Sequence, residues 1–200
     1  MTSRVSRPVY LLSPAYCGGK RARLLTGGRG EFDLAVRLRG AGAPIGEVFS
    51  FLSGLYFRGK LTYAIRFGRA LVITPGRGLV DPEAIVTLAD LRSMAQVEVT
   101  NDDPRFRETF ERDVAALAAT LAPDEPVVLL GSIATGKYVD LLDRLLAGRL
   151  RFPADFVGRG DMSRGGLLLR CVRRSTQLDY IALAGAKRTG KRPPRLGAER

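Results

Sequence analysis

The sequence predicts an α/β fold, a single domain with a mostly parallel sheet of about four to five strands and helices on both faces. Short apolar runs at residues 9–13, 70–74, 127–130 and 150–152 have the length of buried strands. Stretches with helical spacing of apolar residues lie between them, an alternation typical of parallel sheets. With 200 residues, 46% of them hydrophobic, the chain can form one core, and we expect one domain over residues 1–186.

The first half of the chain is expected to form one strand at residues 9–13, a short helix that ends at Gly40, and a long helical stretch over residues 45–67. The pair Ser53-Gly54 interrupts this stretch, which predicts two helices or one broken helix. Lys60 is expected to lie off its apolar stripe. Its aromatic side chains could form a stacking platform for bases, but we expect most of them to pack in the core; they are Phe49, Phe51, Tyr56, Phe57 and Tyr63.

The second half begins with a strand at residues 70–74 and a helical turn at 90–95. Val97 and Val99 alternate in the manner of a short edge strand. Residues 105–121 carry the most regular apolar stripe and predict a helix that Pro104 helps to start. Strands at 127–130 and 150–152, helices at 141–147 and after residue 167, and a last strand at 178–183 complete the prediction.

The chain is strongly basic, with a formal net charge of +12, and this favours a polyanionic partner such as nucleic acid. Six basic residues and one acidic residue give +5 to residues 187–200, which we expect to be a flexible basic tail, and leave +7 for the body. A genome that prefers arginine is the alternative explanation of this charge. The apolar run near the N-terminus is too short for a signal-peptide core, no run has the length of a membrane span, and the expected location is cytoplasmic.

The chain has no histidine, and this excludes the serine–histidine–aspartate and cysteine–histidine sites and most zinc chemistry. The two cysteines, Cys17 and Cys171, do not have the spacing of a metal site or a disulfide framework. We predict no metal and no cofactor. Because histidine is absent, any general acid or base is expected to be Asp, Glu, Lys, Tyr or Cys.

The stretch from Gly131 to Lys137 is a candidate phosphate-binding loop. A strand, a loop bracketed by glycines and a helix direct backbone N–H groups at an anion. The spacing fits G-x-x-x-x-G-K, but the next residue is Tyr138, where a Ser or Thr hydroxyl would hold magnesium. The candidates are Gly131, Ser132, Gly136 and Lys137, and a degenerate P-loop protein is one alternative.

Three further loops that follow predicted strands combine glycine with charge. Because parallel strands end at one edge of a sheet, we expect these loops to share one rim with residues 131–137. Each loop could instead be a plain turn with solvated side chains, and Asp161 could be a helix cap. The candidate residues for binding phosphate or nucleic acid are Cys17, Gly18, Gly19, Lys20, Arg77, Arg159, Ser163 and Arg164, and the candidate general bases are Asp161 and Asp155.

Two segments resemble known families. The motif Ser13-Pro14-Ala15, with residues 71–75 and 78–82, resembles the YaaA-type bacterial proteins, which implies DNA binding and a role in peroxide stress; Arg77 stands where that family has Tyr. Residues 127–134 are similar to the strand of the uracil-DNA glycosylase-like superfamily. Residues 152–165 lie where that superfamily has its C-terminal catalytic loop, but they lack its histidine.

These observations predict a nucleic-acid- or nucleotide-binding α/β protein. Lys20, Arg21, Arg77, Lys137, Arg159 and Arg164 would line an anionic groove. The runner-up is an enzyme that acts on a nucleotide or nucleobase, in the manner of a glycosylase, with Asp161 or Asp155 as general base and Lys137 or Arg159 as electrostatic stabiliser. The third hypothesis is an interaction protein whose basic surface reflects composition alone.

Overall fold

A six-stranded, mostly parallel sheet forms the centre of the molecule in a computed structural model of the chain, which describes residues 7–27, 30–122, 125–134, 136 and 138–194. The order across the sheet is β4-β3-β1-β6-β7-β8. Its strands are β1 (Val9–Leu12), β3 (Arg69–Thr74), β4 (Gly78–Val80), β6 (Val127–Leu130), β7 (Leu150–Pro153) and β8 (Tyr180–Ala182).

Strand β1 lies at the middle of four parallel strands. Val9 pairs with Arg69 of β3 on one side and with Val127 of β6 on the other, and β7 pairs in parallel with β6. All four side chains of β1 are buried, as expected for a strand covered on both faces. The two outer strands, β4 and β8, run antiparallel to their neighbours and form the edges.

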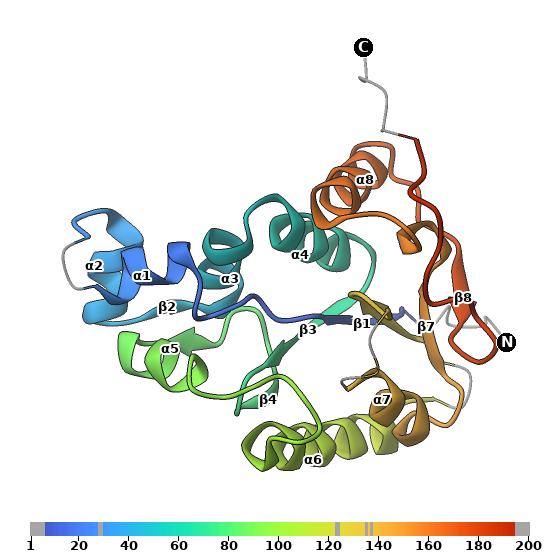
Figure 1. The fold of residues 1–200 in the computed structure, drawn as a ribbon, viewed down its shortest axis with the longest axis horizontal. Helices are drawn as coiled ribbons and strands as arrows, with labels where there is room; N and C mark the ends of the chain where they lie inside the picture. Colours follow the sequence, from blue (N-terminus) through green and yellow to red (C-terminus); the bar gives the residue numbers. More distant parts are fainter. Residues whose placement is uncertain (1–6, 28–29, 123–124, 135, 137, 195–200) are drawn as a thin grey trace, which may run out of the picture.

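Helices cover both faces of the sheet (Figure 1), as the sequence predicts. On one face, α4 (Leu55–Phe67) and α8 (Asp161–Arg173) pack with α3 (Ile45–Ser53) above the side chains of Tyr10 and Leu12. On the other face, α6 (Pro104–Thr120) and α7 (Val139–Leu145) cover Val9 and Leu11. Alternate residues of β1 therefore belong to two different cores.

The remaining elements gather at one end of the molecule, beside α3 (Figure 1). They are the helices α1 (Lys20–Thr26), α2 (Asp33–Arg39) and α5 (Leu88–Met94) and the antiparallel pair β2 (Ala43–Pro44) and β5 (Ile85–Val86). A 3-10 turn, Ala154–Phe156, follows β7. The predicted helices near residues 33–39, 45–67 and 105–121 are confirmed, and Gly54 separates α3 from α4 with a positive φ of 62°.

Several expectations differ from the structure: the sheet has six strands rather than four to five, and α8 begins at Asp161 rather than after residue 167. Val97 and Val99 form no strand, because residues 95–103 turn directly into α6. Strand β4 was not predicted, and its three residues form after a turn in which Gly76 and Gly78 take positive φ values. Lys60 was expected off the apolar stripe of its helix, yet it is 1% exposed.

Helices α4 and α8 cross at two glycines. A methyl group added at Gly59 would lie 2.7 Å from the carbonyl oxygen of Gly165, and one at Gly165 would lie 2.7 Å from that of Leu55. The absence of side chains at both positions therefore allows the two backbones to approach closely. This crossing places the N-terminal ends of both helices over the same end of the sheet (Figure 1).

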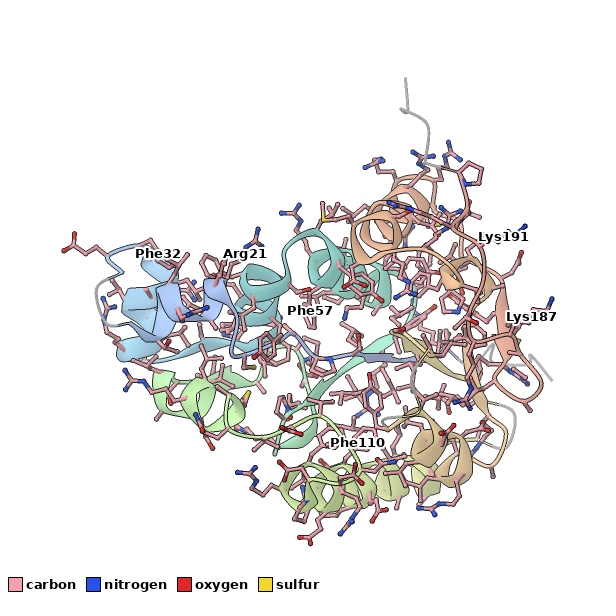
Figure 2. All side chains as sticks on the ribbon, viewed as in Figure 1. Arg21, Phe32, Phe57, Phe110, Lys187 and Lys191 are labelled. Carbon is pink, nitrogen blue, oxygen red and sulfur yellow. The ribbon has the colours of Figure 1, made fainter. Side chains whose placement is uncertain are left out.

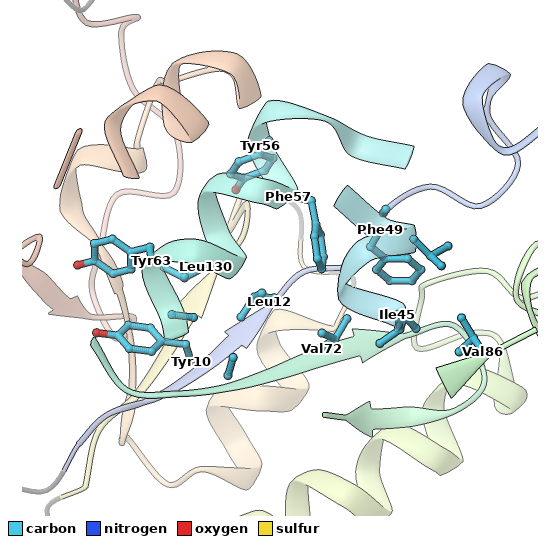
Figure 3. Packing of buried hydrophobic residues seen from close by; sticks show 14 of the residues in the cluster. Tyr10, Leu12, Ile45, Phe49, Tyr56, Phe57, Tyr63, Val72, Val86 and Leu130 are labelled. Atoms are coloured by element: carbon cyan, nitrogen blue, oxygen red, sulfur yellow. The ribbon is translucent and has the colours of Figure 1, made fainter. Parts of the chain in front are cut away.

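A cluster of tyrosines joins α4 to the sheet. The Tyr63 and Tyr10 hydroxyls both bond to the hydroxyl of Tyr180, and Tyr63 also accepts a hydrogen bond of 2.8 Å from the backbone N–H of Leu178. Figure 3 shows Tyr10 and Tyr63 side by side, one from the sheet and one from α4. Most rings of the 45–67 stretch are thus core residues, as predicted, since Phe49, Tyr56, Phe57 and Tyr63 are buried.

Candidate functional site

A well-formed pocket lies where the chain leaves the sheet in opposite directions. After β1 the chain passes to helices on one face, and after β6 it passes to α7 on the other face. A crevice outside the carboxyl ends of two such strands is the usual binding position in open α/β sheets. The pocket has a volume of about 650 Å³. The lining residues used below are Ser13, Tyr56, Lys60, Ser132, Tyr138 and Asp161.

The two strand ends approach each other closely at this position. Ser13 follows β1 directly, and its N–H donates to the carbonyl of Leu130, the last residue of β6, at 3.2 Å. A methyl group at Gly131 would lie 2.9 Å from the Cβ of Ser13. Gly131 therefore allows the loop after β6 to pass beside Ser13, a role in packing that the phosphate-loop interpretation did not require.

Lys60 extends from α4 to the end of β1. Its Nζ lies 2.6 Å from the carbonyl oxygen of Ser13 and 2.8 Å from Ser13 Oγ. The amine also lies 4.5 Å from the centre of the Tyr56 ring and 4.8 Å from that of Phe57. Burial lowers the pKa of Lys60 to about 7, while Asp161 raises it and Arg164 lowers it. With this pKa about half of the Lys60 amine is neutral at pH 7, and titratable groups perturbed in this way are found most often at functional sites.

Two tyrosines from opposite layers enclose the pocket. Tyr56 comes from α4 (Figure 3), and its buried hydroxyl has no hydrogen-bond partner among the described residues. Tyr138 comes from the loop after β6, and its ring packs against Phe106 and Phe110. Burial raises the pKa of both phenols; Arg164 opposes this for Tyr56, and a hydrogen bond with Ser13 opposes it for Tyr138. Both hydroxyls are therefore protonated donors at neutral pH.

Asp161 and Arg164, on the first turn of α8, complete the charged groups near Lys60. Asp161 lines the pocket, and its side chain is 71% exposed. Arg164 lies behind it, with a guanidinium nitrogen 3.5 Å from Asp161 Oδ1. The Arg164 side chain is mainly structural, because its Nε and Nη2 donate to the carbonyl of Phe156 at 3.2 and 3.0 Å.

Basic side chains from α1 form the rim of the pocket. Lys20 and Arg21 both line it, and both are exposed to solvent. Arg21 Nη1 donates to the carbonyl of Phe51 at 3.1 Å, which holds it beside the end of α3. Lys187 and Lys191 lie far from Arg21, on the β8 side of the molecule (Figure 2).

The structure brings together only part of the predicted site. Five of the predicted residues line the main pocket: Gly19, Lys20, Arg21, Ser132 and Asp161. Cys17 and Gly18 line a neighbouring hollow. The Cys17 thiol is buried, which raises its pKa to about 12 and makes it a poor nucleophile.

The other predicted residues lie elsewhere. Arg77 pairs with Asp90 at 3.3 Å, and Arg159 and Ser163 line a separate hollow with Arg192. Asp155 does not line the main pocket, and its carbonyl accepts a hydrogen bond from Arg159. The carbonyl of Gly136 accepts the N–H of Val139 at the start of α7, and Lys137 lies outside the described residues.

The predicted tail also has contacts with the body. Arg188 pairs with Asp140 at the start of α7. A methyl group at Gly158 would meet the carbonyl oxygen of Lys191. Residues 187–194 therefore pass over the loop after β7, and residues 195–200 lie outside the described part of the chain.

Sequence reasoning did not name Ser13 or Lys60 as site residues, and it favoured a place in the core for Tyr56 over a role in stacking on bases. A signal for Lys60 exists: it lies three residues after Phe57, four after Tyr56 and three before Tyr63. These spacings place it on the buried face of α4, where a lysine requires a polar partner. Ser13 was considered as part of a family motif and of the loop over residues 13–20, without a role of its own.

Comparison of the chain with protein-family models, with curated proteins and with solved structures gives no match. The two family resemblances in the sequence therefore stay predictions. Within the described residues, no group of three or more Cys, Asp or Glu side chains could hold a metal ion. Within the same residues, no helix is long and apolar enough to cross a membrane.

Proposed function

We propose that the protein binds nucleic acid or a nucleotide, with a phosphate at Lys20 and Arg21 and a base or sugar inside the pocket at the ends of β1 and β6. The observation that carries the proposal is the position of these two exposed cations on the rim of this pocket. The cavity of about 650 Å³ is in the size range of small-molecule sites.

Three features support this choice. The net charge of +12 favours an anionic ligand, and most of it lies outside residues 187–200. Tyr56 and Tyr138, which are 5% and 6% exposed, both line the pocket, and aromatic side chains in a pocket suit a planar base. The hydroxyl of Tyr56 is a buried donor in need of an acceptor, which a base edge supplies.

The test is fluorescence anisotropy with a labelled single-stranded oligonucleotide over a range of salt concentrations. The variant Lys20→Ser/Arg21→Ser removes two rim cations. We expect it to weaken binding and to reduce the slope of log K against log salt by about 1.4, since each phosphate contact on a single strand contributes about 0.7.

The matched control is Arg39→Ser/Arg69→Ser, which removes the same charge from exposed positions outside the pocket. We expect the control to keep most of the slope. Equal losses in both double variants would show that binding follows net charge alone. No binding at low salt would reject the proposal.

A second candidate function is an enzyme that acts on a nucleotide or nucleobase, with Asp161 as general base. It is favoured because Asp161 lines the pocket, whereas Asp155 does not. The variant Asp161→Asn keeps the shape of the side chain and removes the base. Turnover lost with oligonucleotide binding retained would support this candidate. Since Gly160 is the N-cap of α8, a parallel loss of thermal stability would indicate instead that Asp161 stabilises the first turn of that helix.

A further inference from the structure

We propose that Ser13 and Lys60 form a nucleophile and general-base pair, and that the pocket cleaves an ester or amide bond of an anionic substrate through an acyl-serine intermediate. The negative charge of the substrate rests on the proposed function, because it is inferred from Lys20 and Arg21. The pair itself rests only on the contact between Ser13 and Lys60.

The geometry of the pair fits this chemistry. A neutral amine has two N–H groups and one lone pair. With Nζ 2.6 Å from the Ser13 carbonyl oxygen and 2.8 Å from Ser13 Oγ, one N–H donates to the carbonyl and the lone pair can accept the hydroxyl proton. The carbonyl contact holds the amine in place, so the second contact needs no movement of the side chain.

The surroundings keep the amine neutral often enough to act as a base. Burial lowers the pKa of Lys60 to about 7, so at pH 7 a large fraction of the molecules has a free amine. The groups that face it are Asp161, Arg164, Tyr56 and Tyr138. Asp161 favours the charged amine and Arg164 opposes it, while both tyrosines stay protonated and add no charge.

Ser13 is the accessible member of the pair. It lines the pocket and is partly exposed, whereas Lys60 is 1% exposed. A substrate that enters the pocket therefore reaches Ser13 before it reaches Lys60. Sites that combine a serine with a lysine are an established variant of nucleophilic catalysis.

The reaction balances without a co-reactant other than water. Ser13 Oγ forms a bond to the substrate carbonyl carbon while its proton moves to Lys60 Nζ. The tetrahedral intermediate collapses, the bond to the alcohol or amine breaks, and the leaving group takes that proton from Lys60. Water then attacks the acyl-serine, gives a proton to Lys60, and the acid leaves as Ser13 Oγ recovers the proton.

The unpartnered hydroxyl of Tyr56 is the second observation that points to a ligand. The hydroxyl is buried and has no acceptor among the described residues, and Tyr56 is one of the residues around the same pocket. A protonated phenol of this kind can donate to the oxyanion of the tetrahedral intermediate. The cost of leaving the hydroxyl unpaired in the free protein is then recovered when the intermediate forms.

The experiment uses the full chain and a small alkyl fluorophosphonate, whose phosphorus reacts with activated serines and loses fluoride. Intact-mass and peptide mass spectrometry locate and time the label. The variants are Ser13→Ala and Lys60→Met, and the matched controls are Ser93→Ala, an exposed serine of α5, and Arg58→Met, an exposed neighbour on α4.

We expect the label on Ser13, at a rate that rises with pH around 7, with no label there in Ser13→Ala and unchanged rates in the controls. Lys60→Met should react at least about 100-fold more slowly, the lower bound for loss of a general base. The pH profile of the wild-type protein needs no variant, so it tests the role of Lys60 even if Lys60→Met fails to fold. A labelling rate that does not rise with pH around 7 would contradict a lysine base.

Three further results would overturn the pair: no label on Ser13 in the folded wild-type protein, a label on another residue only, or an unchanged rate in folded Lys60→Met. These results are separate from the oligonucleotide test. Oligonucleotide binding without labelling would reject the nucleophile and base pair and support the proposed function. Labelling without oligonucleotide binding would support the pair and reject the proposed nucleotide ligand.

Discussion

Replacing Lys60 with methionine tests the burial of its amine through the pH dependence of stability. Methionine fills a similar volume and carries no charge. In the folded state the pKa of Lys60 falls from 10.5 to about 7, so between these values the unfolded chain binds the proton and the folded chain does not. Stability therefore rises with pH across this range and is lowest below pH 7.

The magnitude follows from the two pKa values. They differ by about 3.5, and at about 1.4 kcal/mol for each unit the charged amine costs the fold about 5 kcal/mol below pH 7 relative to alkaline solution. Between pH 6 and pH 9 this titration changes the free energy of unfolding by roughly 2.5 kcal/mol. We expect wild-type protein to gain this amount over that range relative to Lys60→Met.

The assay is urea denaturation of both proteins at several pH values, followed by circular dichroism. The loss of the hydrogen bonds to Ser13 shifts the whole curve of the variant without changing its slope, so the difference in slope isolates the lysine. Arg58→Met, an exposed position on the same helix, should follow the wild-type slope. Parallel curves for wild type and Lys60→Met would refute the reasoning about burial.

Three further predictions concern packing and charge. Gly59→Ala should lower the free energy of unfolding by about 1–3 kcal/mol in urea melts, because its methyl group would lie 2.7 Å from the Gly165 carbonyl; an unchanged melt would mean that α4 and α8 separate easily. Tyr63→Phe should cost about 1–3 kcal/mol, because the buried N–H of Leu178 loses its acceptor; Tyr16→Phe, at 80% exposure, is the control and should change little. Removal of residues 187–200 takes +5 of the +12 charge, and salt-dependent oligonucleotide binding should persist in anisotropy titrations; its complete loss would assign binding to the tail.

The sequence by itself determined the α/β class and most of the elements. The apolar runs of β1, β3, β6 and β7 are short and continuous, since both faces of these strands are covered. The stripe of Phe106, Phe110, Val114 and Leu117 predicted α6 correctly, because one helix face packs against the sheet. Local patterns of this kind depend only on the period of the backbone and on burial.

The edges of the sheet were harder to predict. Strand β4 has three residues, too few for a pattern to stand out, whereas β8 lies within the strand predicted at residues 178–183. Val97 and Val99 alternate as a strand would, but no neighbouring strand pairs with them. An edge strand exists only where a partner offers its hydrogen bonds, and the sequence does not say which partner is near.

The tertiary structure alone decided the composition of the site. The glycine loops that the sequence singled out do follow the carboxyl ends of parallel strands, on one side of the sheet. Arg77 and Arg159, however, are held in other contacts there. Ser13 and Lys60 are 47 positions apart and meet because α4 crosses the end of β1. The spacing of Tyr56, Phe57 and Tyr63 indicates that Lys60 is buried, but it does not identify its partner. That depends on how α4 packs across the end of β1 and against α8, where Gly59 and Gly165 allow a close approach, and no local motif encodes this packing.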